Sequence, residues 1–329
     1  MKNLAFAVGA ACVCGFCFAD LYMAGDSTMC NYNPTRQYPQ QGWGQGLANF
    51  MKNPDELHNW AIGGRSARSF TNEGRWAKIV EALKPGDFVI VAFGHNDANR
   101  GKTERYSTPE DFKGFLRDFA RDVKSKDAQL VFATSIPHSG GFSQSEGKMH
   151  VRGGAAGIGP YVQATVEVAQ ELGLGVLDLN KYACEHLPEL GLESANRLYM
   201  RIKPGEYERL PNGQNDGCHI RDTGAVYFAR AAVELAYAQN LPIAKLFKRP
   251  EEVHYTPVPF GGPGSSAKPL KDDFSKEEIP YANAGAKIDN GDDWRRELMN
   301  LRREAQGRGM SKDEASRWAA QEYRRRHRK

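Results

Sequence analysis

The segment LYMAGDSTM, residues 21–29, decides the fold because an apolar run passes directly into a polar turn. Leu21 to Ala24 predict a short buried strand, and Gly25 then permits backbone angles that a Cβ would forbid. The hydroxyl of Ser27 follows just beyond the strand. Taken alone, Gly-Asp-Ser is also ordinary turn chemistry or a helix N-cap, so a functional interpretation depends on further segments of the same kind.

Apolar runs alternate with helical patterns along the chain. The sequence predicts strands at 21–25, 57–62, 87–93, 129–136 and 175–179, and helices at 43–51, 73–83, 109–124, 158–172 and 223–239. Because continuous apolar strands separated by helices are typical of parallel sheets covered on both faces, we expect an α/β protein. In such sheets, functional groups collect in loops beyond the carboxyl ends of the strands.

Two segments lack clear periodicity. The Gly- and Ser-rich segment from Ser139 to Gly159 is expected to be a mobile edge of any binding cleft. Residues 185–215 contain three prolines and are expected to form an irregular insertion.

Two further strand ends carry groups that can stabilise an anion. In NWAIGGRSARSF, residues 59–70, a pair of glycines ending at Gly64 offers backbone amides with no side chain nearby, although a plain turn explains them equally well. In VAFGHNDANR, residues 91–100, four turn-forming residues close an apolar strand. Among them, the side-chain amide of Asn96 can donate to a developing oxyanion.

The last segment of this kind is DGCHIRDTGAVYFA, residues 216–229. A short loop before the helical pattern can bend so that the Asp216 carboxylate meets one imidazole nitrogen of His219 and leaves the other free as a base. Considered singly, a surface His and an unrelated Asp are the favoured interpretation of the two side chains. Together the four segments supply a nucleophile, a base, an orienting acid and oxyanion donors, the inventory for acyl transfer.

These segments resemble the four signature blocks of the SGNH, or GDSL-type, hydrolases. The residues that carry the resemblance are Gly25-Asp26-Ser27, Gly64, Gly94-His95-Asn96-Asp97 and Asp216-Gly217-Cys218-His219. More narrowly, GGRSARSF at 63–70 and FGHND at 93–97 resemble the rhamnogalacturonan acetylesterase branch. The resemblance covers about residues 20–245. It implies a three-layer α/β/α sandwich with a flavodoxin-like parallel sheet, and neither a metal nor an organic cofactor.

The resemblance assigns roles to individual residues. Ser27 would attack an ester carbonyl, His219 would remove its proton, and Asp216 would hold the imidazole. The oxyanion would bind to the backbone amides of Ser27 and Gly64 and to the side chain of Asn96. Supporting roles would fall to Asp26, which orders the Ser27 turn, and to His95 and Asp97, which flank Asn96. The implied substrate is an acetylated polysaccharide or oligosaccharide, most closely acetylated rhamnogalacturonan from pectin.

Arg65 and Arg68 follow the oxyanion glycine and are candidates to pair with a galacturonate carboxylate, because a guanidinium matches a carboxylate well. The alternative is an internal ion pair that rigidifies this loop. Comparing an acidic polymer with a neutral ester would separate the two interpretations.

Cysteine usage indicates neither a disulfide framework nor a metal site. Only Cys30, Cys184 and Cys218 lie beyond the first nineteen residues. If the loops of Cys30 and Cys218 meet, a disulfide could join them. Free buried thiols that behave as small apolar groups are the favoured alternative.

Residues 1–19, MKNLAFAVGAACVCGFCFA, have the pattern of a signal peptide, with cleavage expected after Ala19. A lipoprotein acylated at Cys12 and a buried apolar segment are weaker interpretations. No other run reaches the length of a transmembrane helix, so we expect a secreted or periplasmic protein without stable membrane insertion.

The remaining chain is expected to comprise a hydrolase domain at 20–248, a linker at 249–291 and a basic helical tail at 292–329. Residues 245–329 carry 19 Lys and Arg against 14 Asp and Glu, whereas the rest carries 25 against 26. The near-neutral body argues against a nucleic-acid partner. The tail's partner stays open.

Three alternative functions stay open. A lipase, lysophospholipase or thioesterase would keep the machinery and take a longer acyl group, and an esterase acting on acetylated xylan would change only the sugar. A carbohydrate-binding protein without catalysis would instead use Trp43, Trp60 and Trp76 as sugar platforms.

Overall fold

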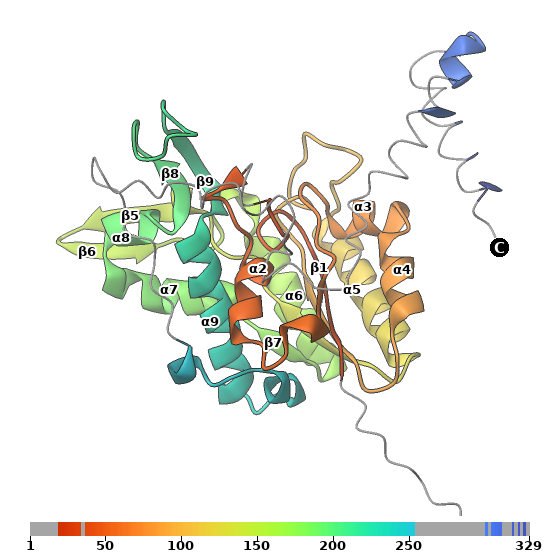
Figure 1. The fold of residues 1–329 in the computed structure, drawn as a ribbon, viewed down its shortest axis with the longest axis horizontal. Coiled ribbons are helices and arrows are strands. Elements are labelled where there is room, and N and C mark those ends of the chain that lie inside the picture. Colours follow the sequence, from red (N-terminus) through yellow and green to blue (C-terminus); the bar gives the residue numbers. More distant parts are fainter. Residues whose placement is uncertain are drawn as a thin grey trace, which may run out of the picture. The chain divides into compact units, whose positions relative to one another are not determined.

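Five strands form one parallel sheet in the computed structural model, which describes residues 19–33, 37–253, 300–301, 304–310, 318, 322 and 325–326 (Figure 1). The strands are β1 (Leu21–Gly25), β2 (Leu57–Asn59), β3 (Phe88–Ala92), β4 (Gln129–Ala133) and β7 (Gly175–Leu177). Their order is β2-β1-β3-β4-β7. In register, Leu21 lies opposite both Leu57 and Phe88. This is the flavodoxin-like strand order. The order in which successive strands are added to the sheet reverses between β1 and β3.

The alternation of strand side chains creates two apolar cores, one on each face of the sheet. In β1, Leu21 and Met23 belong to one buried cluster, while Tyr22 and Ala24 belong to the other. β3 divides in the same way, with Phe88 and Ile90 on the first face. Since both faces are buried, the strands have to be apolar throughout, which explains their continuous hydrophobic sequence.

Helices cover both faces and complete three layers (Figure 1). The first core includes side chains from α2 (Trp43–Leu47), α7 (Leu179–Leu190) and α9 (Asp222–Ala238). The second includes side chains from α3 (Ala67–Asn72), α4 (Arg75–Ala82), α5 (Pro109–Lys124) and α6 (Gly159–Leu172). α5 begins where the sequence predicts, because the Thr108 side chain accepts the Asp111 N–H and Pro109 occupies the first helical position. The α/β/α fold expected from the sequence is therefore confirmed.

Several connections are more regular than expected. The segment 139–159, expected to be a mobile loop at the edge of a cleft, contains an antiparallel hairpin of β5 (Phe142–Ser145) and β6 (Lys148–Val151). Residues 185–215 are likewise not an irregular insertion. They contain the end of α7, then α8 (Leu192–Asn196) and β8 (Tyr199–Ile202), which pairs with β9 (Gln214–Ile220).

Short 3₁₀ turns link some of these elements, at Ala48–Phe50, Pro54–Glu56, Ser139–Gly141, Ala155–Gly157, Pro242–Leu246 and Pro250–Glu252. The first of them replaces the end of the helix expected over 43–51. Four of the five strands are also shorter than predicted, and β1 alone among them has the predicted bounds.

The chain divides into two compact units, residues 1–284 and 285–329. Residues 1–18 of the expected signal segment, residues 254–291 of the expected linker and most of the basic helical tail lie outside the described residues. Within the second unit, Leu301 and Ala305 are buried and Glu304 belongs to a helix. Among the residues that the structure describes, no helix is long and apolar enough to cross a membrane.

Candidate active site

Ser27 lies in the turn directly after β1, and neighbouring side chains fix this turn. The buried carboxylate of Asp26 accepts hydrogen bonds from the backbone N–H and the hydroxyl of Thr28, both at 2.9 Å. The carbonyl of Ser27 accepts from the Tyr32 hydroxyl at 2.7 Å. Burial opposes ionisation of Asp26, but the hydrogen bond and charge of His95, with help from Thr28, lower its pKa. An ionised carboxylate thus holds the Ser27 backbone in place.

The glycine pair after β2 lies beside Ser27. The Ile62 N–H donates to the Gly25 carbonyl at 3.0 Å, which ties this segment to the end of β1. A Cβ built on Gly63 would lie 3.6 Å from the Cβ of Ser27. Gly64 has a φ of 77°, which residues with a side chain rarely adopt. Backbone amides unobstructed by side chains therefore adjoin the serine.

The turn after β3 packs against both preceding turns. The Nδ1 of His95 lies 3.4 Å from Asp26, and its Nε2 donates to the Ile136 carbonyl at 3.1 Å. The side-chain amide of Asn96 donates one hydrogen bond to the Arg65 carbonyl at 3.0 Å. That bond anchors the Asn96 amide next to Gly64 and leaves a second N–H on the same nitrogen.

Asp97 joins the same turn to helix α3 from within the core. One of its oxygens accepts the backbone N–H of Ala67 at 3.0 Å, while the other is buried without a hydrogen-bond partner. Burial, together with the charge of Asp26, raises the pKa of Asp97 to about 8. The carboxyl is therefore largely protonated at neutral pH.

Asp216 and His219 lie in a bulge of β9, not in the loop before a helix that the sequence suggests. Tyr199 pairs with Ile220 and Arg201 with Asn215, so the segment Asp216–His219 stands opposite the single residue between Tyr199 and Arg201. Such bulges redirect side chains and are common beside active sites. The surplus residues are what turn this carboxylate and imidazole toward one another.

Within the bulge, Asp216 makes contacts through both of its oxygens. Oδ1 accepts the backbone N–H groups of Cys218 and His219, and Oδ2 lies 2.6 Å from Nδ1 of His219. Because an ionised carboxylate only accepts, Nδ1 carries the proton and Nε2 is left with a lone pair. This is the tautomer that a general base requires.

The charges in this pair stabilise each other. Burial opposes ionisation of Asp216, but the hydrogen bond and charge of His219 and the two backbone donors lower its pKa to about 2. Burial likewise opposes protonation of His219, but the hydrogen bond and charge of Asp216, together with the charge of Asp26, raise its pKa above the ordinary value. Asp216 is consequently ionised at any working pH.

One short segment joins the Ser27 turn to the His219 bulge. The Trp43 N–H donates to the Thr28 carbonyl at 2.9 Å, and the Gln41 N–H donates to the Ile220 carbonyl at 3.1 Å. The turn after β1 and the bulge of β9 thus lie at the same end of the molecule (Figure 1).

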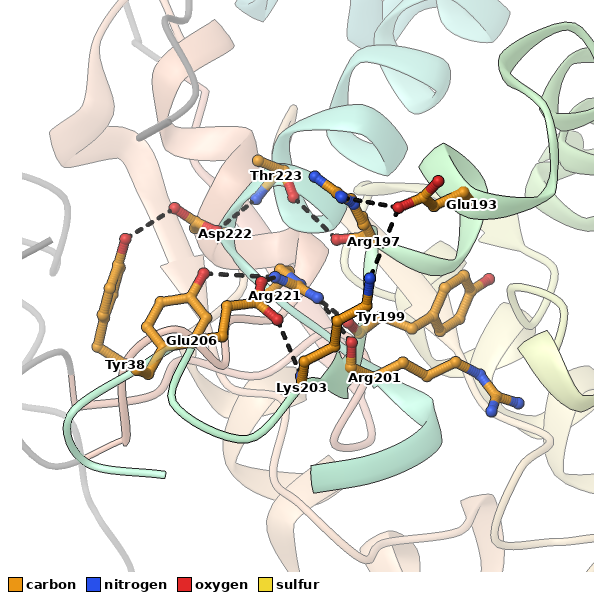
Figure 2. Close-up of polar contacts among 11 residues, drawn as sticks. Tyr38, Glu193, Arg197, Tyr199, Arg201, Lys203, Glu206, Arg221, Asp222 and Thr223 are labelled. Atoms are coloured by element: carbon orange, nitrogen blue, oxygen red, sulfur yellow. Dashed lines mark hydrogen bonds and ion pairs between the residues drawn. The ribbon is translucent and has the colours of Figure 1, made fainter. Parts of the chain in front are cut away.

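Arg221 binds the strand that pairs with the bulge (Figure 2). Its fully buried guanidinium donates to the carbonyls of Tyr199 and Arg201, both at 2.9 Å. On β8, these two residues flank the position opposite the bulge. It also donates to the Glu206 carboxylate at 2.6 Å and to the Tyr207 hydroxyl at 3.4 Å. The guanidinium thus supplies hydrogen-bond donors for two β8 carbonyls that lie opposite the bulge.

A polar cluster that no sequence motif predicts lies against the bulge. A Cβ built on Gly217 would lie 2.8 Å from Ser139 Oγ, 2.9 Å from His138 Cε1 and 3.0 Å from Arg201 Nη2. Three side chains from two other segments therefore pack against the residue between Asp216 and Cys218. Ser139 and Arg201 lie in segments expected to be irregular, and His138 directly precedes the first of them, so no motif or spacing marks these side chains.

The two arginines singled out by the sequence are both paired with acidic residues. Arg65 donates to Glu73 at 3.1 Å and to the Gly63 carbonyl at 2.9 Å. Arg68 pairs with Asp111 at 3.3 Å. The structure therefore favours the internal ion pairs that were considered as the alternative to carboxylate recognition.

Cys30, Cys184 and Cys218 are free thiols, so a disulfide between Cys30 and Cys218 does not form. Burial raises the pKa of the Cys30 thiol to about 12, which makes it unreactive. In the described part of the chain, no group of three His, Cys, Asp or Glu residues is arranged to hold a metal ion.

An α/β sheet with these turns gathered at one end defines a class of enzymes that transfer acyl groups to water. Residues 23–219, more than half of the chain, match the GDSL-like lipase/acylhydrolase family. The chain belongs to this family and is a carboxylic ester hydrolase.

Similar proteins narrow the comparison. Rhamnogalacturonan acetylesterase RhgT of Bacillus subtilis is 32% identical over 223 residues, which cover 68% of this chain and 91% of that protein. A rhamnogalacturonan acetylesterase of Emericella nidulans is 29% identical over 54% of this chain and 74% of its own length. The crystal structure of Bacillus subtilis YxiM is 30% identical, with a TM-score of 0.57, and the match covers 68% of this chain and 57% of that one.

Proposed function

We propose that this protein is a secreted serine esterase that removes O-acetyl groups from a plant cell-wall polysaccharide, with acetylated rhamnogalacturonan as its substrate. The observation that carries the proposal is the 2.6 Å contact between Asp216 and His219, in a bulge tied through one short segment to the Ser27 turn. The relatives named rhamnogalacturonan acetylesterases support the choice of substrate. The N-terminal segment supports secretion.

In the proposed mechanism, Nε2 of His219 removes the proton of Ser27 as the hydroxyl attacks the acetyl carbonyl. The amides of Ser27 and Gly64 and the free N–H of Asn96 stabilise the oxyanion, each contributing roughly 10²- to 10³-fold in rate. His219 then protonates the sugar oxygen, which leaves with the polysaccharide. Water, activated by the same imidazole, releases acetate from the acyl-enzyme.

The acyl group and the sugar are the parts of the proposal that need a direct test. Acetate release should be measured on acetylated pectin, xylan and chitin fragments, together with turnover of aryl esters of increasing acyl length. We expect the highest kcat/KM on the pectin fragments and a steep fall beyond acetyl. A preference for long acyl chains would support the lipase or thioesterase alternative. A preference for xylan fragments would support an esterase that acts on acetylated xylan.

The carbohydrate-binding alternative without catalysis is not supported. Trp43 and Trp76 are only 1% and 4% exposed, and both belong to the apolar cores, so neither can stack on a sugar. Trp60 is partly buried against the second core. The aromatic platforms that this alternative needs are thus largely absent from the surface.

Activity is expected to rise with pH until His219 has lost its proton. Because Asp216 raises the pKa of His219 above its ordinary value of 6.5, the rise in kcat/KM should be centred above pH 6.5. Asp216→Asn removes the carboxylate whose hydrogen bond and charge raise the pKa of His219, so the imidazole should titrate at lower pH in that variant. NMR titration of the His219 ring in both proteins measures the shift directly. Identical titration curves would contradict the assigned pairing.

A further inference from the structure

Arg201 carries a charge that lacks an acidic partner beside the Asp216–His219 bulge. Its half-buried side chain donates from Nε to the Ser139 hydroxyl at 2.7 Å and from Nη1 to the Asn215 side-chain oxygen at 2.7 Å. Both acceptors are neutral. Within the described part of the chain, no ion pair joins this guanidinium to a carboxylate.

Other arginines around the site differ in this respect. Arg68 and Arg221 pair with Asp111 and Glu206, respectively. Arg65 pairs with Glu73, a carboxylate that it shares with Arg75. Arg105 lies against Gly64, and its Nε is 3.5 Å from Glu104. Figure 2 shows the Arg201 side chain extending away from the cluster around Arg221, so the two guanidinium groups do not share Glu206.

The position of Arg201 places it on the side of the leaving sugar. In the proposed mechanism the acetyl carbonyl faces Gly64 and Asn96, whereas the sugar oxygen is protonated by His219. The sugar therefore lies along the His219 bulge. Arg201 Nη2 lies against Gly217, two residues from His219 in the same bulge. Arg105, in contrast, lies against Gly64 on the acyl side.

We propose that Arg201 binds the carboxylate of a uronic acid residue in the acetylated substrate; this inference rests on the proposed esterase function. The two N–H groups of Nη2 and one N–H of Nη1 are left after the contacts with Ser139 and Asn215, and a guanidinium can pair with a carboxylate through two parallel hydrogen bonds. These two contacts hold the guanidinium in place, so little side-chain entropy is lost on binding. A substrate with a neutral sugar gains nothing from this contact.

The test uses two substrates that differ only in charge: acetylated galacturonate oligomers with free carboxyl groups, and the same oligomers methyl-esterified. Acetate release is measured so that cleavage of the methyl ester does not count, and p-nitrophenyl acetate reports the chemistry alone. The variants are Arg201→Gln, Arg201→Lys and, as a matched control, Arg197→Gln. Arg197 lies just before β8 and pairs with Glu193 at 2.8 Å on the surface (Figure 2).

Wild-type protein should prefer the free acid, and Arg201→Gln should lower kcat/KM on it about 10- to 100-fold, mainly through KM. Changes on the methyl ester and on p-nitrophenyl acetate should stay within about twofold, which also shows that the variant is folded. Arg201→Lys should recover part of the preference, since it keeps the charge without the planar guanidinium. Arg197→Gln should retain the full preference.

Three results would overturn the proposal. If Arg201→Gln lowered kcat/KM equally on all three substrates, Arg201 would only support the structure of the β8–β9 strand pair. If Arg201→Gln kept the preference for the free acid, another residue would bind the carboxylate. Loss of that preference in Arg105→Gln would place carboxylate binding beside Gly64, on the acyl side. A wild-type enzyme that cleaves p-nitrophenyl acetate without preferring the acid would refute carboxylate recognition while leaving the esterase function standing.

Discussion

Replacing Ser27 with Ala is expected to lower kcat on an acetyl ester by about 10⁴- to 10⁶-fold, the range found when a serine nucleophile is removed. The oxygen that forms the acyl-enzyme is lost, whereas the surrounding turn is not. Asp26 still accepts from Thr28, and Tyr32 still donates to the carbonyl at position 27. KM for the same ester should change little.

This prediction needs a control that separates chemistry from folding. Ser143→Ala removes a hydroxyl from the exposed strand β5 and should leave kcat within about twofold of wild type, as most surface changes do. Thermal unfolding of both variants should match that of wild type. If Ser27→Ala keeps near-full activity on the acetyl ester, Ser27 is not the nucleophile.

Glu206→Gln is expected to destabilise the fold by about 3 kcal/mol, because it removes a carboxylate that pairs with a buried guanidinium at 2.6 Å. Arg221 is fully buried and Glu206 is 12% exposed, so water cannot replace the lost carboxylate. For a domain of this size, such a loss lowers Tm by roughly 6–12 °C. Since Arg221 binds the strand that pairs with the bulge, kcat should fall as well, while binding of neutral substrates changes less.

The matched control is Glu193→Gln, which removes a carboxylate that is 72% exposed and paired with Arg197. Exposed ion pairs contribute about 0–1 kcal/mol, so this variant should unfold close to wild type. Urea denaturation of both variants, with the transition followed by circular dichroism, gives the comparison. Equal losses of stability would mean that the buried pair has no special role in holding the bulge.

Much of the fold was predictable because its strands are buried on both faces and are therefore apolar throughout. The turns at Ser27, Gly64 and Asn96 could be located for the same reason, since each follows directly where such a run ends. Local sequence contains this information. The position of a polar turn relative to an apolar strand does not depend on contacts made far along the chain.

The bulge in β9 could not be predicted in this way. Its existence depends on register against β8, and β8 lies in a segment with no recognisable periodicity. The hydrogen bonds of Arg221 to β8 and the cluster around Gly217 are long-range contacts for the same reason. The pairing of Arg65 and Arg68, and the burial of Trp43 and Trp76, likewise follow from packing that no spacing in the sequence reveals.

The central claim is that Ser27 is activated by an imidazole that lies far along the chain. The most direct measurement is the rate at which a fluorophosphonate reagent labels the protein, with the modified residue identified by mass spectrometry, in wild type and in His219→Ala. The account predicts labelling of Ser27 in wild type and labelling at least about 100-fold slower in His219→Ala, because general-base assistance is lost. Modification of a different residue, or equal rates in the two proteins, would contradict it.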